Sequence, residues 1–165
     1  MSWFLGRKHP EKRYEVGNET RAASTLDMIH SDVSGPMPTT SINGSRYFLT
    51  FIDDCSRFYW VYFMKQQSEV FKIFKVFKAL IENSFRKKIK SNRSDNGGEY
   101  IKRDFQHFCE LEGIRMEHTN PYTPQQNGVA ERKNRSLKEM ATCLLQSKNI
   151  PPSLWEEAVN CASYF

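Results

Sequence analysis

Two consecutive stretches of the chain are apolar on both faces, and they constrain the fold more than any other feature. Residues 46–53 include the run Tyr-Phe-Leu-Thr-Phe-Ile, and residues 58–64 read Phe-Tyr-Trp-Val-Tyr-Phe-Met. Aromatic and β-branched residues favour strands, and a strand that is apolar on both faces must be covered on both. Asp53 and Asp54 lie between the two stretches, where a hairpin needs polar turn residues, so we interpret them as turn residues and not as metal ligands.

Hydrophobic spacing predicts the remaining elements of an α/β fold. Alternating or short apolar runs bounded by turn residues predict strands at residues 26–33, 89–94 and 114–118. Apolar residues repeated at intervals of three and four predict helices at residues 68–86, 103–112, 128–147 and 154–165. A chain of 165 residues is long enough to bury one core, so we expect a single domain.

The charge and the N-terminal segment limit the environment and the partners. The net charge of +5 permits a polyanionic partner without establishing one. Residues 1–24 are polar and basic without a sustained period, which predicts a flexible lead-in whose cations either contact phosphates or remain solvated. The segment Met1–Leu5 is too short for a signal peptide, and no apolar run could span a membrane, so we expect a protein that is not secreted.

The four cysteines are widely separated in the sequence, at positions 55, 109, 143 and 161. None forms a Cys-x-x-Cys pair, and no histidine flanks them at the spacing of zinc ligands. We therefore expect buried free thiols.

Three acidic residues occupy positions that suit phosphoryl chemistry. Asp32 ends the predicted strand 26–33, Asp95 follows the predicted strand 89–94, and Glu131 lies in the predicted helix 128–147, with thirty-five residues between Asp95 and Glu131. Three carboxylates can hold two divalent metals about 4 Å apart for in-line displacement at phosphorus, and such oxygen ligands suit Mg²⁺ or Mn²⁺. The alternatives are a turn residue at Asp32 and a surface ion pair between Glu131 and Arg135.

Polar and basic residues beside Glu131 are candidates for nucleic-acid contacts. The helical period places Glu131, Arg135 and Lys138 on one face, with Lys133 towards the apolar side, so that three cations could contact phosphates. The loop 119–127 ends in three residues with uncharged amide side chains: Gln125, Gln126 and Asn127. These amides contact bases or sugars, or else the loop is an ordinary connection without a binding role.

Four motifs follow one another from about Leu26 onward. They are His30-Ser31-Asp32, Phe51-Ile52-Asp53-Asp54-x-Ser56-Arg57, Arg93-Ser94-Asp95-Asn96-Gly97-Gly98-Glu99 and Pro121-Tyr122-Thr123-Pro124-Gln125-Gln126-Asn127-Gly128-Val129-Ala130-Glu131-Arg132. In order and spacing, they resemble the integrase core of copia-type (Ty1/copia) LTR retrotransposons. The resemblance implies an RNase H-like fold, with a mixed five-stranded sheet and helices on both faces. It also implies an Asp-Asp-Glu triad of catalytic and metal-binding residues at Asp32, Asp95 and Glu131.

The function implied by the resemblance is DNA integration. A metal-dependent polynucleotidyl transferase of this kind trims retroelement DNA ends and joins them to target DNA, acts as a homo-oligomer, and is nuclear and cytoplasmic. The alternatives are a catalytically idle or domesticated nucleic-acid-binding core and an RNase H-type hydrolase of RNA–DNA hybrids.

The chain departs from the family pattern at both ends. Residues 1–24 resemble a remnant of the family's N-terminal zinc-module region, but Trp3 stands where its last cysteine is expected, so we expect no zinc here. The family's C-terminal domain is not in the sequence, so we expect residues 25–165 to be a catalytic core truncated at its C-terminus.

Overall fold

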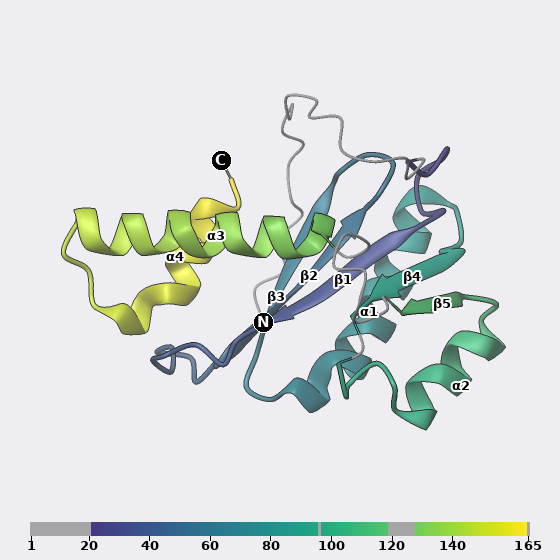
Figure 1. The fold of residues 1–165 in the computed structure, drawn as a ribbon, viewed down its shortest axis with the longest axis horizontal. Helices are drawn as coiled ribbons and strands as arrows, with labels where there is room; N and C mark the ends of the chain where they lie inside the picture. The colour runs from purple at the N-terminus through teal and green to yellow at the C-terminus, as the bar shows by residue number, and fades with distance from the viewer. Residues whose placement is uncertain (1–20, 96, 119–127, 165) are drawn as a thin grey trace.

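Five strands form one mixed sheet in the order β3-β2-β1-β4-β5 (Figure 1). The computed structural model describes residues 21–95, 97–118 and 128–164. The strands are β1 (Ile29–Ser34), β2 (Tyr47–Asp53), β3 (Tyr59–Met64), β4 (Ser91–Ser94) and β5 (Arg115–His118). β1, β2 and β3 pair antiparallel, whereas β4 is parallel to β1 and β5 is parallel to β4. The mixed five-stranded sheet implied by the resemblance is therefore confirmed.

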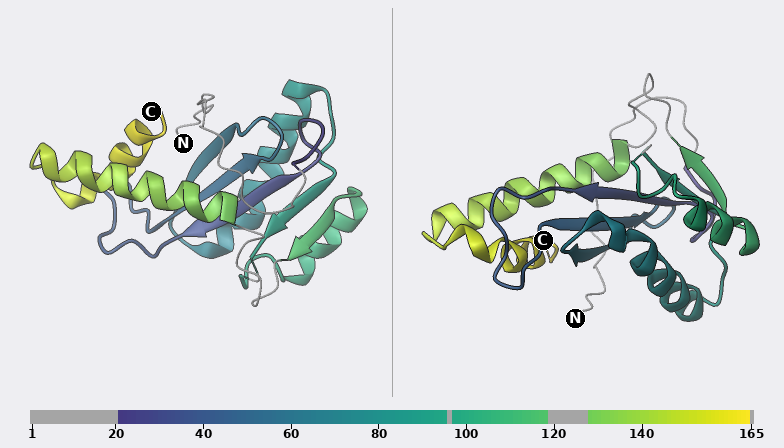
Figure 2. Two further views of the ribbon diagram at one scale, coloured as in Figure 1. Left: turned by 45° about the horizontal axis from the view of Figure 1, so that its top comes forward. Right: turned by 90° about the horizontal axis from the view of Figure 1, so that it is seen from below.

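Helices cover both faces of the sheet (Figure 2). The helices α1 (Val70–Phe85) and α2 (Arg103–Leu111) pack on one face, and α3 (Gly128–Ser147) and α4 (Trp155–Ala162) pack on the other. Short 3-10 turns at Gln67–Glu69 and Pro152–Leu154 lead into α1 and α4. None of the helices within the described ranges is long and apolar enough to cross a membrane.

The two cores arise from alternation along the central strands. Phe51 of β2 stacks on Phe77 of α1, with ring centroids 4.1 Å apart and an interplanar angle of 12°. Phe48 points to the opposite face, where its ring centroid lies 6.4 Å from that of Trp155 in α4. Because successive side chains of a strand point to opposite faces, a strand between two helical layers must be mostly apolar on both faces, as β2 is apart from Thr50 and Asp53.

The main differences from the predicted elements lie at their ends. β1 begins at Ile29 and not at residue 26, because Leu26 has a φ of 67° and donates its backbone N–H to Oδ1 of Asp53 at 2.8 Å. The helix predicted from residue 68 starts as a 3-10 turn and becomes α-helical at Val70. The last helix ends at Ala162.

Asp53 and Asp54 organise the turn between β2 and β3, as expected. Asp53 Oδ2 accepts hydrogen bonds from the backbone N–H of Ser56 at 2.7 Å and from its hydroxyl at 2.6 Å. Asp54 Oδ1 lies 2.8 Å from Nε2 of His30. Burial alone would raise the pKa of Asp54, but His30, the N–H of Ala22 and the Arg57 guanidinium hold the pKa at about 2. Both carboxylates are committed to these structural contacts.

The four cysteines are free thiols, but the predicted burial is confirmed only for Cys109. Cys55 is partly exposed, and Cys143 and Cys161 are exposed because they lie on outward faces of the helices α3 and α4. Burial raises the pKa of Cys109 to about 12, so this thiol stays protonated within the core under α2.

Candidate active site

Asp32 lies on the central strand β1 with its side chain nearly buried. It sits opposite Thr50 of β2 in the antiparallel register, and the residue is only 9% exposed. A carboxylate this deep in a sheet needs a hydrogen-bond partner, because burial of an unpartnered charge is costly. The partner comes from the helix that packs across this face of the sheet.

Asn134 of α3 bridges Asp32 and Thr50. Its side-chain N–H donates to Asp32 Oδ2 at 2.7 Å, and its carbonyl oxygen accepts from the Thr50 hydroxyl at 2.8 Å. Asn134 is 4% exposed and Thr50 is fully buried, so water does not compete for these bonds. The bridge orients the Asp32 carboxylate and ties α3 to β1 and β2.

Substitution of Asn134 by alanine is expected to destabilise the protein by about 1–3 kcal/mol. The Asp32 carboxylate would lose its buried partner, and the Thr50 hydroxyl would keep only a long hydrogen bond, of 3.5 Å, to the Asp32 carbonyl. Urea unfolding at pH 7 measures the change. The exposed Gln146→Ala variant on the same helix is the matched control and should change stability by less than about 0.5 kcal/mol. Equal stabilities of the Asn134→Ala variant and the control would contradict the bridge.

A pocket of about 380 Å³ opens between the end of β1 and α3. The strand side contributes Asp32, Val33, Ser34 and Gly35, and the helix side contributes Glu131, Asn134, Arg135 and Lys138. Gly35 has a φ of 134°, and a Cβ there would lie 2.7 Å from the carbonyl oxygen of Arg46. Only glycine therefore lets the chain leave β1 at this point.

Asp95 follows β4 and reaches the same edge of the sheet as Asp32. β1 and β4 are parallel neighbours, with Ile29 paired to Asn92 and His30 to Arg93, so the C-terminal ends of the two strands lie at the same edge of the sheet. The Asp95 side chain accepts a hydrogen bond from the N–H of Gly97 at 3.0 Å. Two parallel strands thus deliver one acid each to this edge of the sheet.

The electrostatics of Asp32 reflect this convergence of acids. Burial raises the pKa of Asp32 to about 7 from a usual value of 3.8, and the charges of Asp95, Glu131 and Glu99 contribute to the rise. The hydrogen bond from Asn134 acts in the opposite direction and lowers the pKa. A site that concentrates negative charge in this way favours a bound cation.

The donor chemistry of the site fits a hard divalent cation. In the described part of the chain no group of three or more His, Cys, Asp or Glu side chains converges closely enough to hold a metal by itself. Mg²⁺, however, keeps several waters and is usually held by one or two carboxylates together with substrate phosphates. The carboxylates available here, Asp32, Glu131 and Asp95, supply oxygen ligands of that kind.

The structure separates the basic candidates into two groups. Arg135 and Lys138 line the pocket together with Asp32 and Glu131. The Nζ atom of Lys133 lies instead 4.1 Å from the ring centroid of Tyr59, on the sheet side of the helix. The candidates Gln125, Gln126 and Asn127 lie outside the described residues.

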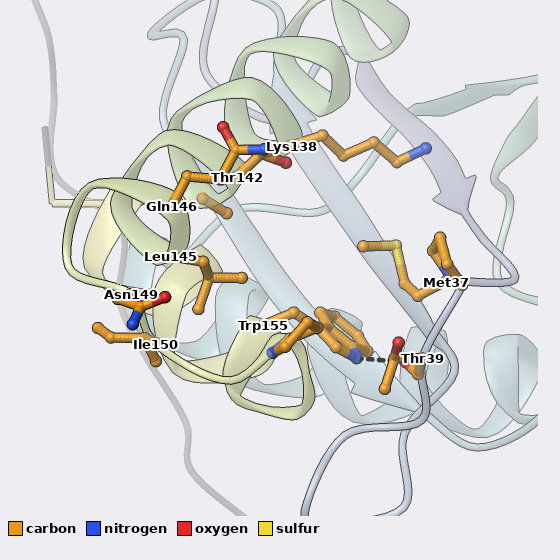
Figure 3. A pocket seen from close by; sticks show the side chains of 12 residues that line it. Met37, Thr39, Lys138, Thr142, Leu145, Gln146, Asn149, Ile150 and Trp155 are labelled. Carbon is orange, nitrogen blue, oxygen red and sulfur yellow. Dashed lines mark hydrogen bonds between the residues drawn. The ribbon is translucent and has the colours of Figure 1, made fainter.

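A second pocket of about 380 Å³ adjoins the first at Lys138, which lines both. Its lining is mainly apolar, and Figure 3 shows Met37, Leu145 and Trp155 around it, with Lys138 extended along its rim. The Trp155 indole N–H donates to the Thr39 carbonyl at 2.9 Å. This bond fastens the segment after β1 to the start of α4.

Two residues of the site, Asn134 and Glu99, were not among the sequence candidates. Asn134 lies one helical turn after Glu131, so the interval of three residues was an available signal that both face the sheet edge. Glu99 lies within the motif that contains Asp95, yet only its burial in the structure, at 9% exposure, distinguishes it from a surface acid.

Residues 23–124 match the family described as the integrase core domain. The chain belongs to this family. Its relatives include the Retrovirus-related Pol polyprotein from transposon TNT 1-94 of Nicotiana tabacum, which is 47% identical over 161 residues, and that from transposon RE2 of Arabidopsis thaliana, which is 36% identical over 162 residues. The Ty1-DR4 Gag-Pol polyprotein of Saccharomyces cerevisiae is 31% identical over 133 residues.

The integrase core is a small part of these relatives. The match to the tobacco polyprotein covers 98% of the chain but 12% of the polyprotein, the match to RE2 covers 98% and 11%, and the yeast match covers 79% and 8%. All three are named as Pol or Gag-Pol polyproteins of transposons, Ty1 among them, which confirms the resemblance to copia-type (Ty1/copia) elements.

The fold of this integrase core also occurs in a solved viral assembly. A simian T-cell lymphotropic virus intasome in complex with the PP2A regulatory subunit B56 gamma contains a chain that aligns with a TM-score of 0.69. The alignment covers 94% of the present chain and 53% of the viral chain, at 21% identity. This likeness, together with the mixed sheet, identifies the fold as RNase H-like.

Proposed function

We propose that this integrase core is the catalytic part of a DNA-integration enzyme, a metal-dependent polynucleotidyl transferase that trims retroelement DNA ends and joins them to target DNA. The observation that carries the proposal is the arrangement around Asp32. Asn134 holds its carboxylate against α3, one turn from Glu131, and the charge of Asp95 reaches it from the neighbouring strand. Membership of the integrase core family supports the same interpretation.

The three acids have distinct surroundings that suit a shared role as metal ligands. Asp32 is nearly buried and hydrogen-bonded, Asp95 is half-buried at the end of β4, and Glu131 is exposed on the first turn of α3. Two bound Mg²⁺ or Mn²⁺ ions would activate the attacking oxygen and stabilise the leaving oxygen of the phosphodiester. The hydrogen bond from Asn134 favours the charged form of Asp32, which is the form that binds a cation.

Arg135 and Lys138 are proposed to bind the phosphates of DNA next to the acids, and the amides of Gln125, Gln126 and Asn127 to contact bases or sugars. Removal of one cation that binds a phosphate is expected to reduce the slope of log affinity against log salt by about 0.9. The Arg135→Gln and Lys138→Gln variants should therefore bind a DNA duplex more weakly at low salt and with a shallower slope than the wild type. Fluorescence anisotropy over a salt series measures both quantities.

The control for these variants is Lys72→Gln, which removes an exposed lysine from α1 on the opposite face of the sheet. It should retain the affinity and the slope of the wild type. Equal reductions in the control and in the two pocket variants would contradict a localised DNA site.

The partners follow from the reaction. Two DNA ends and a target must meet, so we propose that the active form contains more than one copy of the chain, acting in the cytoplasm and the nucleus. The viral relative in fold is described as an intasome, which supports this proposal.

The proposed function is tested with a branched DNA substrate that reports strand joining by disintegration, in the presence of Mn²⁺. Mn²⁺-dependent release and joining of the DNA strands is expected. Cleavage of an RNA–DNA hybrid without DNA joining would identify an RNase H-type hydrolase instead. DNA binding without metal-dependent joining of strands would identify a nucleic-acid-binding core that does not catalyse the reaction.

A further inference from the structure

Glu99 is a fourth acidic residue at the edge of the sheet, held in place by its neighbours. Tyr100, the next residue, is fully buried and packs its ring 5.6 Å from that of Phe105, measured between centroids. The N–H of Tyr100 donates to the carbonyl of Gly97 at 3.0 Å, which closes the turn after Asp95. Glu99 therefore lies on a segment anchored in the core.

The side chain of Glu99 turns back over Gly97 towards Asp95. A Cβ atom on Gly97 would lie 2.6 Å from Oε1 of Glu99 and 2.9 Å from Oδ1 of Asp95. The two carboxylate oxygens thus approach one point from two residues, and they occupy the space that a side chain at residue 97 would need. Gly97 has no positive φ, so its backbone conformation does not require glycine. Glycine is required because the two carboxylate oxygens lie too close to the position of a Cβ atom.

This pair of carboxylates is poorly compensated within the described part of the chain. Glu99 is 9% exposed, yet among the described residues no other side chain forms a hydrogen bond or an ion pair with it. Lys102 acts on Glu99 only through its charge, and the carboxylate's remaining contact is with its own backbone amide. An almost buried carboxylate beside a second one is costly unless a cation neutralises them.

We propose that Glu99 is an additional metal ligand of the active site, which together with Asp95 binds a hydrated divalent cation. The inference rests on the proposed function and extends its acid triad by a fourth residue. One or two carboxylates with several waters are the usual protein ligands of Mg²⁺. Oε1 of Glu99 and Oδ1 of Asp95 approach the same point above Gly97, which allows one ion to contact both carboxylates.

Calorimetric titration of the metal-free 165-residue protein with Mn²⁺ tests the inference. The Glu99→Gln variant keeps the size of the side chain and removes its charge. It should bind Mn²⁺ about 10-fold more weakly than the wild type or worse, in the range that removal of a supporting ligand commonly causes. The matched control is Glu110→Gln, which alters an exposed glutamate on α2 and should bind as the wild type does.

A second variant separates metal binding from a purely structural role. Gly97→Ala keeps both acidic residues, but its methyl group displaces their carboxylates from each other, so it should also weaken Mn²⁺ binding. The Glu99→Gln variant should in addition unfold at a higher temperature than the wild type without metal, because a like-charge repulsion with Asp95 is removed. A residue needed only for folding would lower the unfolding temperature.

The outcomes distinguish this inference from the proposed function. If the wild type binds Mn²⁺ and both Glu99→Gln and Gly97→Ala bind it equally well, Glu99 is not a ligand and the proposed function stands. If the wild type binds no Mn²⁺, the proposed function fails and the inference fails with it. Weaker binding by both variants, with the control unchanged, supports Glu99 as a ligand.

Discussion

Replacing Glu131 by glutamine is expected to abolish Mn²⁺-dependent DNA strand joining and to leave the fold intact. Glu131 is exposed on the first turn of α3 and lines the pocket with Asp32, so the substitution removes a charge without opening the core. Removal of one preorganised electrostatic group commonly costs about 10²–10³ in kcat. The rate of disintegration of a branched DNA substrate measures the decrease, and the unfolding temperature should change by no more than a few degrees.

The control for this prediction is Glu139→Gln, which changes another exposed glutamate of α3 away from the pocket. Its rate of strand joining should equal that of the wild type. Full activity of the Glu131→Gln variant would exclude Glu131 as a catalytic residue, and with it the Asp-Asp-Glu triad.

Replacing Asp32 by asparagine is expected to stabilise the metal-free protein at pH 8. The pKa of Asp32 rises on folding from 3.8 to about 7, so its charged form is disfavoured in the folded state. At about 1.4 kcal/mol for each pKa unit, a rise of about three units corresponds to a gain on the order of 4 kcal/mol when the charge is removed. The same substitution should abolish strand joining, since it removes a proposed metal ligand.

The pH dependence of this gain has a definite sign. Below pH 4 Asp32 is protonated in both the folded and the unfolded state, so the asparagine variant has no advantage there. As pH rises from about 4 to about 7, the unfolded chain releases the proton first and the wild type loses stability relative to the variant. Urea unfolding in EDTA at several pH values measures the difference in the free energy of unfolding.

Two further measurements complete this test. The Asp104→Asn variant, altered at an exposed residue of α2, should show no such pH-dependent gain. Addition of Mn²⁺ should stabilise the wild type more than the Asp32→Asn variant, because a ligand stabilises the state that binds it. A gain at pH 4 equal to that at pH 8 would contradict the assigned pKa shift.

The arrangement of layers was predictable because it depends on local patterns. The apolar faces of β2 and β3 required helices on both sides, and the helix predicted at 128–147 has those bounds in the structure. The start of β1 was wrong by three residues, since the left-handed Leu26 and its bond to Asp53 depend on a residue in another strand. Spacing along one segment carries no signal for such a contact.

The candidate site was predictable only in part, for a related reason. Asp32 and Asp95 could be identified from the sequence, because each lies at the end of a predicted strand next to glycine-containing turn residues. The interval of three residues from Glu131 places Asn134 towards the same edge, but its pairing with Asp32, 102 residues away in the chain, leaves no local pattern. Thr50, the second partner of Asn134, looks like any β-forming residue. The role of Asn134, which contacts polar groups on both β1 and β2, can be recognised only when the pairing of these two strands is known.

The two-sided character of α3 limits how this chain can change over time. Leu137 and Ala141 of α3 are buried against the sheet, and Glu131, Arg135 and Lys138 line the pocket on the adjoining face. Insertion or deletion of one residue within the helix would rotate every later side chain by about 100°. Such a change would both disrupt the pocket and destabilise the protein, because it would bury charged side chains and expose apolar ones. A chain with a single-residue insertion or deletion in this part of α3 would misfold. A chain that still folds therefore keeps the spacing between Glu131, Asn134, Arg135 and Lys138.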